Sequence, residues 1–359
     1  MDTTVDAAPQ VPTVRHQMRF EGSGGEYFKI WIVNLALSIV TLGIFSAWAK
    51  VRSKRYFYGN TYIGEHSFDY HANPLRILLG RLVALCLLLG YTATIHFMPA
   101  ATFVWYLVFA VAGPWLINAS LRFNARNTSY RNVRFNFEGN YGEAFVTYVL
   151  LPIVAVITLL TTYPLARRAR DHYSINNRTF GNKYFQAQIP GWPMYKIYLL
   201  ALLISMGLLM LGIVLVTSLV TVTGIDFKSI DPKLPGTAMK FLLAFGSMYA
   251  LVFLTMTTFV GTKVFNLALN HTMLADRYRF EATLSSLHMI WLLASNLVLT
   301  LVTLGLFYPW AAVRLARYRC QQIAITGPAD MDGFMSEVMT GQGAVGEEIA
   351  SFFDVDIGL

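Results

Sequence analysis

The stretch GEHSFDYH, from Gly64 to His71, carries the residue types best suited to metal or proton chemistry. If this stretch is a β-strand, Glu65, Asp69 and His71 lie on one face, because successive side chains of a strand alternate between faces. Carboxylates and an imidazole together can hold a divalent cation. A related stretch, GNKYFQAQ from Gly181, keeps none of the three. The sequence therefore predicts a solvated strand here, with no metal cofactor.

No other group of residues indicates a reaction. The glycine-rich GSGGE from Gly22 lacks the Lys-Ser/Thr ending of a phosphate loop, and no Ser-His-Asp or HExxH arrangement can be assembled. The two cysteines, Cys86 and Cys320, form no CxxC, so we expect free thiols. The sequence leaves enzymatic activity open, leans against it, and indicates no cofactor.

A basic, aromatic motif occurs twice: TLGIFSAWAKVRSKRY from Thr41 and TLGLFYPWAAVRLARY from Thr303. On a helix, its Trp, two Arg and Tyr share one face. Trp and Tyr prefer the headgroup level of a membrane, and Arg reaches phosphates from there, which favours a membrane anchor. The alternative is a cleft that binds lipid headgroups. The residues predicted for this role are Trp48, Arg52, Arg55, Tyr56, Trp310, Arg314, Arg317 and Tyr318.

Asn34 and Asn296 are polar residues at matched positions in apolar segments. Amides buried among membrane helices usually bond across helices and contribute on the order of 1 kcal/mol. The pattern favours such packing contacts over the alternative, a contact with a substrate or an ion.

The elements that position these residues are membrane segments. The chain has 359 residues, of which 55% are hydrophobic and 13% charged, and its mean hydropathy is +0.48; soluble domains average about 25% charged residues. The N-terminus lacks the apolar core of a signal peptide. The sequence predicts a multi-pass membrane protein with apolar segments at 27–47, 78–97, 101–121, 144–166, 197–223, 241–262 and 288–310.

Net charge is +8, and the basic residues border the apolar segments. This placement predicts contact with the anionic headgroups of a phospholipid bilayer and argues against a nucleic-acid partner. After Arg319 the chain has no Lys or Arg and is acidic. We expect this tail to be mostly disordered, with a short helix around Glu347 to Phe353, and to fold back on the basic loops or bind a protein partner.

Internal similarity divides the chain into three related units. Each has a strand-like stretch, an apolar helix broken at Gly43, at Pro164, or at Gly305 with Pro309, and then a basic aromatic border. The predicted division is a polar tail (1–17), unit 1 (18–76), a transmembrane helix pair (77–121), unit 2 (122–196), a second pair (197–262), unit 3 (263–326) and an acidic tail (327–359).

Two topologies fit this division. In the favoured one, an all-α polytopic protein, each repeat helix enters and leaves on the cytoplasmic side, so that every basic loop and the short β-strands lie inside. The broken backbone must then be buried or satisfied within the protein. The alternative has seven spanning helices with inverted repeats, which would place the basic run after Ala166 outside.

The motif TLGIFSAWAKVRSKRYFYGNTYIG, preceded by RFEGSGGEYF, resembles the YjgN family of bacterial inner-membrane proteins. The resemblance extends from about Arg19 to Ile325 and leaves out the acidic tail after Gly327. It implies a multi-pass protein of the bacterial inner membrane, and it implies no reaction, because the family has no known function.

Three classes of function follow from these observations. The favoured class is a non-enzymatic membrane module that organises lipid or other membrane proteins. The alternative is a transporter or channel, since repeated units with broken helices are typical of transporters. A lipid-headgroup enzyme has the least support.

Overall fold

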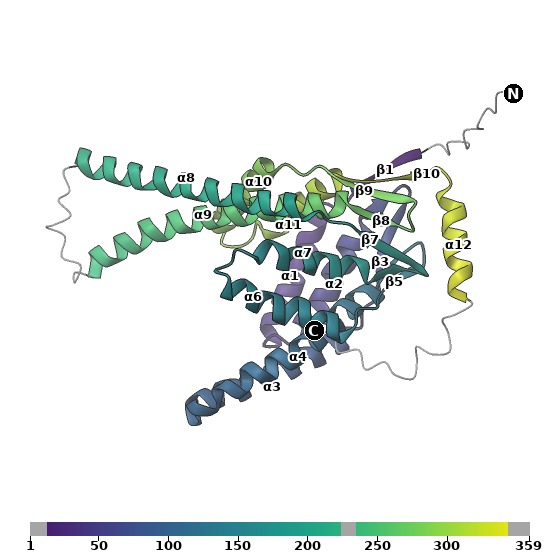
Figure 1. Cartoon of the computed structure of the whole chain (residues 1–359), viewed down its shortest axis with the longest axis horizontal. Coiled ribbons are helices and arrows are strands. Elements are labelled where there is room, and N and C mark those ends of the chain that lie inside the picture. Colours follow the sequence, from purple (N-terminus) through teal and green to yellow (C-terminus); the bar gives the residue numbers. More distant parts are fainter. Residues whose placement is uncertain (1–12, 224–234, 344–359) are drawn as a thin grey trace.

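The computed structural model describes residues 13–223 and 235–343. Within these residues, ten short antiparallel strands close into a barrel in the order β1-β10-β9-β8-β7-β6-β5-β4-β3-β2 (Figure 1). Their bounds are β1 Thr13–Phe20, β2 Thr61–Ile63, β3 His66–Tyr70, β4 Thr128–Tyr130, β5 Val133–Phe137, β6 Arg178–Phe180, β7 Lys183–Ala187, β8 Thr272–Leu274, β9 Tyr278–Ala282 and β10 Ile323–Pro328. The first and last strands pair with each other, so the two ends of the chain close the barrel.

The expectation of an all-α polytopic fold is wrong, and so is the alternative of seven spanning helices. The strand-like stretches do form strands, but they join into one closed sheet instead of isolated ribbons. A ribbon of two short strands is marginal on its own, whereas closure pairs every edge. In the described residues, only four helices are long and apolar enough to cross a membrane.

Helices leave the barrel in pairs and return to it. The pairs are α1 Gly24–Val40 with α2 Ser46–Gly59; α3 Pro74–Phe97 with α4 Thr102–Arg126; α5 Tyr141–Phe145, η2 Val146–Leu150 and α6 Leu151–Ile157 with α7 Tyr163–Asn176; α8 Gly191–Thr223 with α9 Pro235–Asn270; and α10 Ser286–Val302 with α11 Tyr308–Gln321. The 3₁₀ turn η1, Pro99–Ala101, joins α3 to α4.

A backbone hydrogen bond closes the base of each of these five described helical hairpins. The five bonds are Glu21 N to Asn60 O (3.0 Å), His71 N to Asn127 O (2.8 Å), Glu138 N to Asn177 O (2.8 Å), Gln188 N to His271 O (3.0 Å) and Thr283 N to Gln322 O (3.0 Å). Both ends of every hairpin are therefore fixed at the barrel, because each bond continues a strand pairing.

The tips of two short hairpins turn through a left-handed glycine. Gly43 has φ +91° and Gly305 has φ +92°, conformations that favour glycine. Thr41 Oγ1 donates to Leu37 O (2.7 Å) and accepts from Phe45 N (2.9 Å), and Thr303 makes the same two bonds. The broken backbone is thus satisfied within its own turn. In the middle unit the break falls at Leu159 and Leu160, and Pro164 instead begins α7.

The two long hairpins contain the four apolar helices. These candidate membrane spans are Pro74–Phe97, Pro99–Arg126, Gly191–Leu215 and Met248–Asn270. A 24-residue helix such as α3 is about 36 Å long, enough to cross a hydrocarbon core of about 30 Å. The helices Tyr141–Ile157 and Ser286–Val302 are apolar but shorter.

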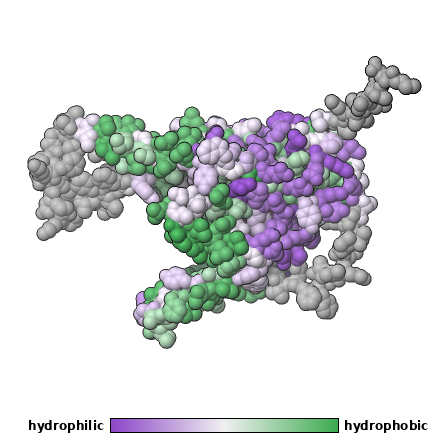
Figure 2. Space-filling model, viewed as in Figure 1, coloured by the Kyte–Doolittle hydropathy of each residue, from purple (hydrophilic) through white to green (hydrophobic). Residues whose placement is uncertain are grey.

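Hydrophobic and hydrophilic residues gather at opposite ends of the molecule. In Figure 2, hydrophobic residues cover α3 and the coloured part of α8, which project from the body in Figure 1, and hydrophilic residues cover the barrel. The hairpin tips also expose apolar side chains, with Leu42 and Leu304 each 94% accessible. The hairpin end is therefore the end that suits a membrane.

Helix α12, Met331–Gly343, covers the end of the barrel opposite the hairpins. Its residues Phe334, Met335 and Val338 are buried against lumen residues such as Tyr130 and Phe180. The expectation of a mostly disordered tail is therefore wrong for residues 331–343, because these three apolar residues form one face of a helix. The helix expected around Glu347 to Phe353 lies outside the described residues.

Candidate ligand-binding lumen

The barrel interior is an aromatic cavity of about 290 Å³. Strand alternation points one residue of every two inward, and these inward residues are mostly large and apolar. Phe135 packs against Phe180 and Phe185, with ring centroids 4.9 and 6.2 Å apart, and Phe185 packs against Phe280 at 5.8 Å. Pockets that bind small molecules have this character, mainly apolar with few polar groups.

A second cavity of about 420 Å³ adjoins the barrel interior on the side of the helices. Phe68, Phe135 and Arg178 line both cavities, so the two adjoin along the barrel axis. Polar groups contributed to this second cavity include Tyr58 of α2 and Asn124 of α4. We call the two cavities together the lumen.

Arg178 is the charged residue at the junction of the two cavities. It lies two residues from Phe180 on β6, and alternation therefore directs both side chains into the lumen. Its side chain faces cavity space and so keeps accessible surface, but the surrounding protein lowers the pKa of its guanidinium. Among the described residues, the guanidinium of Arg178 makes no hydrogen bond or ion pair, although its backbone pairs with Phe137 in the sheet. An unpaired guanidinium at the wall of an apolar cavity can form a charge-assisted hydrogen bond with an anion that enters the lumen.

α12 closes the end of the lumen far from the hairpins. Met331, Phe334 and Met335 line the barrel cavity. Ion pairs orient the helix: Arg131 with Asp332 (2.6 Å), Arg277 with Glu337 (3.0 Å), and Lys183 with Glu337. The lumen is thus covered by apolar contacts, with charges at their edge.

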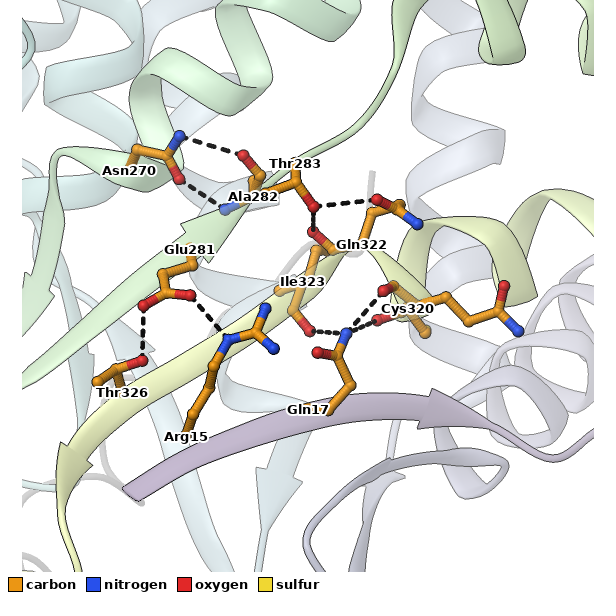
Figure 3. A network of polar contacts seen from close by, with 11 residues as sticks. Arg15, Gln17, Asn270, Glu281, Ala282, Thr283, Cys320, Gln322, Ile323 and Thr326 are labelled. Carbon is orange, nitrogen blue, oxygen red and sulfur yellow. Dashed lines mark hydrogen bonds and ion pairs between the residues drawn. The ribbon is translucent and has the colours of Figure 1, made fainter. Parts of the chain in front are cut away.

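A polar network joins the first and last strands where the barrel closes (Figure 3). Gln17 Nε2 donates to the carbonyls of Gln321 (2.7 Å) and Ile323 (3.0 Å). Glu281 accepts from Thr326 Oγ1 (2.7 Å) and Arg15 Nε (2.9 Å), and these bonds lower the pKa of its carboxyl group. All these groups have partners within the network, so we assign it to barrel closure and not to ligand binding.

The predicted residues Asn34 and Arg52 lie together, and so do Asn296 and Arg314. Arg52 Nη1 donates to Asn34 Oδ1 (3.1 Å), and Arg314 Nη1 donates to Asn296 Oδ1 (2.7 Å). Each pair joins the two helices of one hairpin. The asparagines thus bond across helices, each to one nitrogen of an arginine. The role of the asparagines and arginines toward lipid or substrate stays a prediction.

Tyr56 and Tyr318 bond to the residue that caps the first helix of their own hairpin. Tyr56 OH accepts from Ser23 N (2.8 Å), and Tyr318 OH accepts from Ser285 N (2.8 Å). Tyr173, the counterpart in the middle unit, donates to Asn140 O (3.0 Å). These tyrosines therefore fasten the base of each short hairpin.

Side chains near the base of each hairpin's second helix donate to backbone at the start of the next hairpin. The five bonds are Arg55 Nε to Tyr70 O (3.2 Å), Arg122 Nε to Phe137 O (3.3 Å), Arg168 Nε to Ile189 O (2.6 Å), Asn266 Nδ2 to Leu284 O (2.9 Å) and Arg317 Nη2 to Gly22 O (3.0 Å). Because the last bond returns to α1, the five described hairpins form a closed ring. The predicted anchors Arg55 and Arg317 belong to this ring.

The tryptophans of the motif lie in the first turn of the second helix of their hairpins. Trp48 stacks on Phe45 (6.1 Å), and Trp310 packs on Phe28 of α1 (5.1 Å). Trp310 is 37% accessible, which is compatible with the headgroup level of a bilayer.

The three weak metal candidates do not come together. Glu65 lies in the turn between β2 and β3, Asp69 lies on β3, and His71 follows β3 and bonds Ser129 Oγ through Nε2 (2.7 Å). Across residues 13–223 and 235–343, no group of three or more His, Cys, Asp or Glu side chains is placed to hold a metal ion.

Sequence reasoning did not single out Arg178. It looked like one more cation in a basic loop, and only the alternation Arg178-Thr179-Phe180 could have indicated an inward position. Only the closure of the barrel turns one face of each strand toward a lumen, and no local pattern in the sequence indicates that closure.

The chain is thus built as a small closed barrel with an aromatic lumen, joined to helical hairpins suited to a membrane. It belongs to the YjgN family of bacterial inner-membrane proteins: the family described as "Bacterial protein of unknown function (DUF898)" matches residues 15–352. It is 25% identical to the inner membrane protein YjgN of Salmonella typhimurium strain LT2 over 355 residues, covering 88% of this chain and 89% of that protein.

Two YjgN proteins of Escherichia coli match over a shorter stretch. Identity is 31% over 149 residues for strain O157:H7 and 32% over 150 residues for strain K12, each covering 41% of this chain and 37% of that protein. No solved structure matches the chain.

Proposed function

We propose that this chain is a multi-pass protein of the bacterial inner membrane whose lumen binds an anionic amphiphile. The apolar tail would occupy the barrel cavity and the acidic group would pair with Arg178. The observation that carries the proposal is an aromatic lumen with one inward, partner-free arginine among the described residues. In this proposal the protein binds its ligand and catalyses no reaction. The proposal narrows the favoured role, the organisation of lipid, to the binding of one class of amphiphile.

The membrane placement is supported by the shape of the molecule and by its relatives. Related proteins are named inner membrane proteins, and the four candidate spans belong to two hairpins that project from the apolar end. Basic residues concentrate on α2, α7 and α11, near the barrel, and the positive-inside rule then puts the barrel in the cytoplasm. The cavity on the helix side would face the inner leaflet, from which an amphiphile can enter.

The lumen suits such a ligand in size as well as in chemistry. Pockets of about 300–1,000 Å³ with a few placed polar groups are typical ligand sites. An acyl chain gains about 0.8 kcal/mol for each methylene that it buries. The carboxylate or phosphate would form a charge-assisted hydrogen bond with the guanidinium, stronger than a neutral one.

Transport is the second candidate, and the adjoining cavities favour it. They follow the barrel axis from the helices to α12, so displacement of α12 would open the far end. A transporter predicts solute flux in proteoliposomes that rises when residues 331–343 are removed, whereas a binding module predicts no flux.

The binding test uses purified full-length protein in detergent and two fluorescent probes of equal chain length, a fatty acid and the matching alcohol. Arg178→Gln should weaken binding of the acid roughly tenfold or more and leave the alcohol unchanged, because only the acid has charge to pair. Arg279→Gln is the matched control, since Arg279 points outward from the barrel wall on β9. Equal affinity of the acid for wild type and Arg178→Gln would overturn the proposal.

A further inference from the structure

Ser46, Lys50 and Lys54 form a stripe along one face of α2. They are four residues apart, so they lie one above another on the helix. At one end of the stripe, Arg81 of α3 donates to Ser46 Oγ. At the other end, Lys54 Nζ donates to Asn124 Oδ1 of α4 (2.7 Å). The stripe therefore faces the long hairpin α3/α4, and Lys50 lies in its middle.

Lys50 and Lys54 on this face of α2 and Arg81 of α3 are three neighbouring cations. In the part of the chain that the structure describes, none of them pairs with a carboxylate. Burial lowers the pKa of both lysines, and repulsion by Arg81 on Lys50 and by Lys50 on Lys54 lowers it further. Like charges repel, and the desolvation of each cation adds to the cost. An anion supplied from outside the chain would remove both costs.

The middle unit of the same chain contains its own counter-ion at this place. Tyr56 OH donates to Ser23 O (2.9 Å) as Tyr173 OH donates to Asn140 O (3.0 Å), and in that register Lys50 corresponds to Arg167 and Lys54 to Asp171. Arg167 and Asp171 form an ion pair at 3.0 Å. The first unit thus replaces the anionic member of that pair with a second cation.

We propose that Lys50, which lies between Arg81 and Lys54, binds the phosphate group of an anionic phospholipid between α2 and α3, with the two flanking cations adding to the positive potential of the site. Arg81 lies about 10 Å along α3 from its start at the barrel, a depth from which arginine reaches headgroup phosphates. Exposed Leu79, Leu82 and Leu85 on the same helix offer apolar surface for the acyl chains. The site depends on α3 crossing the membrane, and it meets the lumen at Asn124, which accepts from Lys54 and also lines the second cavity.

The test is native mass spectrometry of the full-length protein in detergent, titrated with phosphatidylglycerol and, separately, with phosphatidylcholine. Lys54→Asp recreates the ion-pair arrangement of the middle unit and should weaken phosphatidylglycerol binding roughly tenfold. Lys50→Gln should do the same, and it removes no hydrogen bond of the described structure, so it tests the site even if Lys54→Asp folds poorly. Arg76→Gln, an exposed cation on α3, is the matched control and should bind as wild type does.

Three further outcomes complete the design. Unchanged phosphatidylglycerol affinity in both α2 variants would overturn the site. Inorganic phosphate should displace bound phosphatidylglycerol only weakly. If it displaced the lipid as effectively as added phosphatidylglycerol does, the site would bind free phosphate and not a lipid headgroup. Lys50→Gln should lower phosphatidylglycerol affinity by the same factor in an Arg178→Gln background as in the wild type, because the lumen does not include Lys50. Failure of the lumen proposal and failure of this one can thus be told apart.

Discussion

At the scale of single residues, the tip turns show how one backbone conformation is made with different side chains. Gly43, Leu160 and Gly305 occupy the same position, and each donates its N–H five residues back, at 2.6–2.7 Å. Leu160 has φ +65°, which costs a non-glycine residue about 1 kcal/mol or more. The middle unit therefore carries strain that the other two avoid.

Leu160→Gly should stabilise the protein, because it removes this strain at an exposed site where little packing is lost. The expected gain is up to about 1 kcal/mol, reduced by the greater entropy of glycine in the unfolded chain. Gly43→Ala should destabilise it by a similar amount. Denaturation midpoints in one detergent measure both, and a loss of stability in Leu160→Gly would show that the left-handed turn is not the costly feature.

At the scale of elements, α12 is held mainly by apolar burial. Phe334, Met335 and Val338 are each 6% accessible or less, whereas Glu337 is at the edge. Phe334→Ala should weaken the docked helix by about 3–5 kcal/mol. The ion pairs of an exposed group contribute much less and are screened by salt.

Hydrogen exchange of residues 331–340 measures the docking of α12. We expect faster exchange in Phe334→Ala at all salt concentrations, and a small, salt-dependent effect in Glu337→Gln. Lys183 and Arg277 lower the pKa of Glu337 in the folded state, so its contribution is present above the unfolded pKa and is lost as pH falls through the folded pKa. A larger effect for Glu337→Gln than for Phe334→Ala would contradict this ranking.

The sequence predicted elements better than it predicted their assembly. Alternation identified the stretches that became β1, β5 and β9, and Gly43 and Gly305 marked the helix breaks. Closure of the barrel depends on pairing between β1 and β10 from opposite ends of the chain, and no local pattern records it. For the same reason the surroundings of Arg178 and Arg81 could not be predicted, since the residues around each come from distant parts of the sequence.

At the scale of the whole molecule, the fold places the turns of the barrel at one end and the hairpin tips at the other. Glu65, between β2 and β3, and Asp276, between β8 and β9, both lie in turns at the barrel end, whereas Met98 lies between α3 and α4 at their tip. With the barrel in the cytoplasm, single cysteines at Glu65 and Asp276 should react with a membrane-impermeant thiol reagent only in opened cells. A cysteine at Met98 should react in intact cells.

The experiment needs a background without Cys86 and Cys320, both of which are free thiols. It is decisive because seven spanning helices would put Glu65 and Asp276 on opposite sides of the membrane, whereas a closed barrel cannot separate them. Labelling of Glu65 alone from outside would therefore contradict the fold. Labelling of both from outside would leave the barrel intact but reverse its orientation, and the lumen would then have to take its ligand from the outer leaflet.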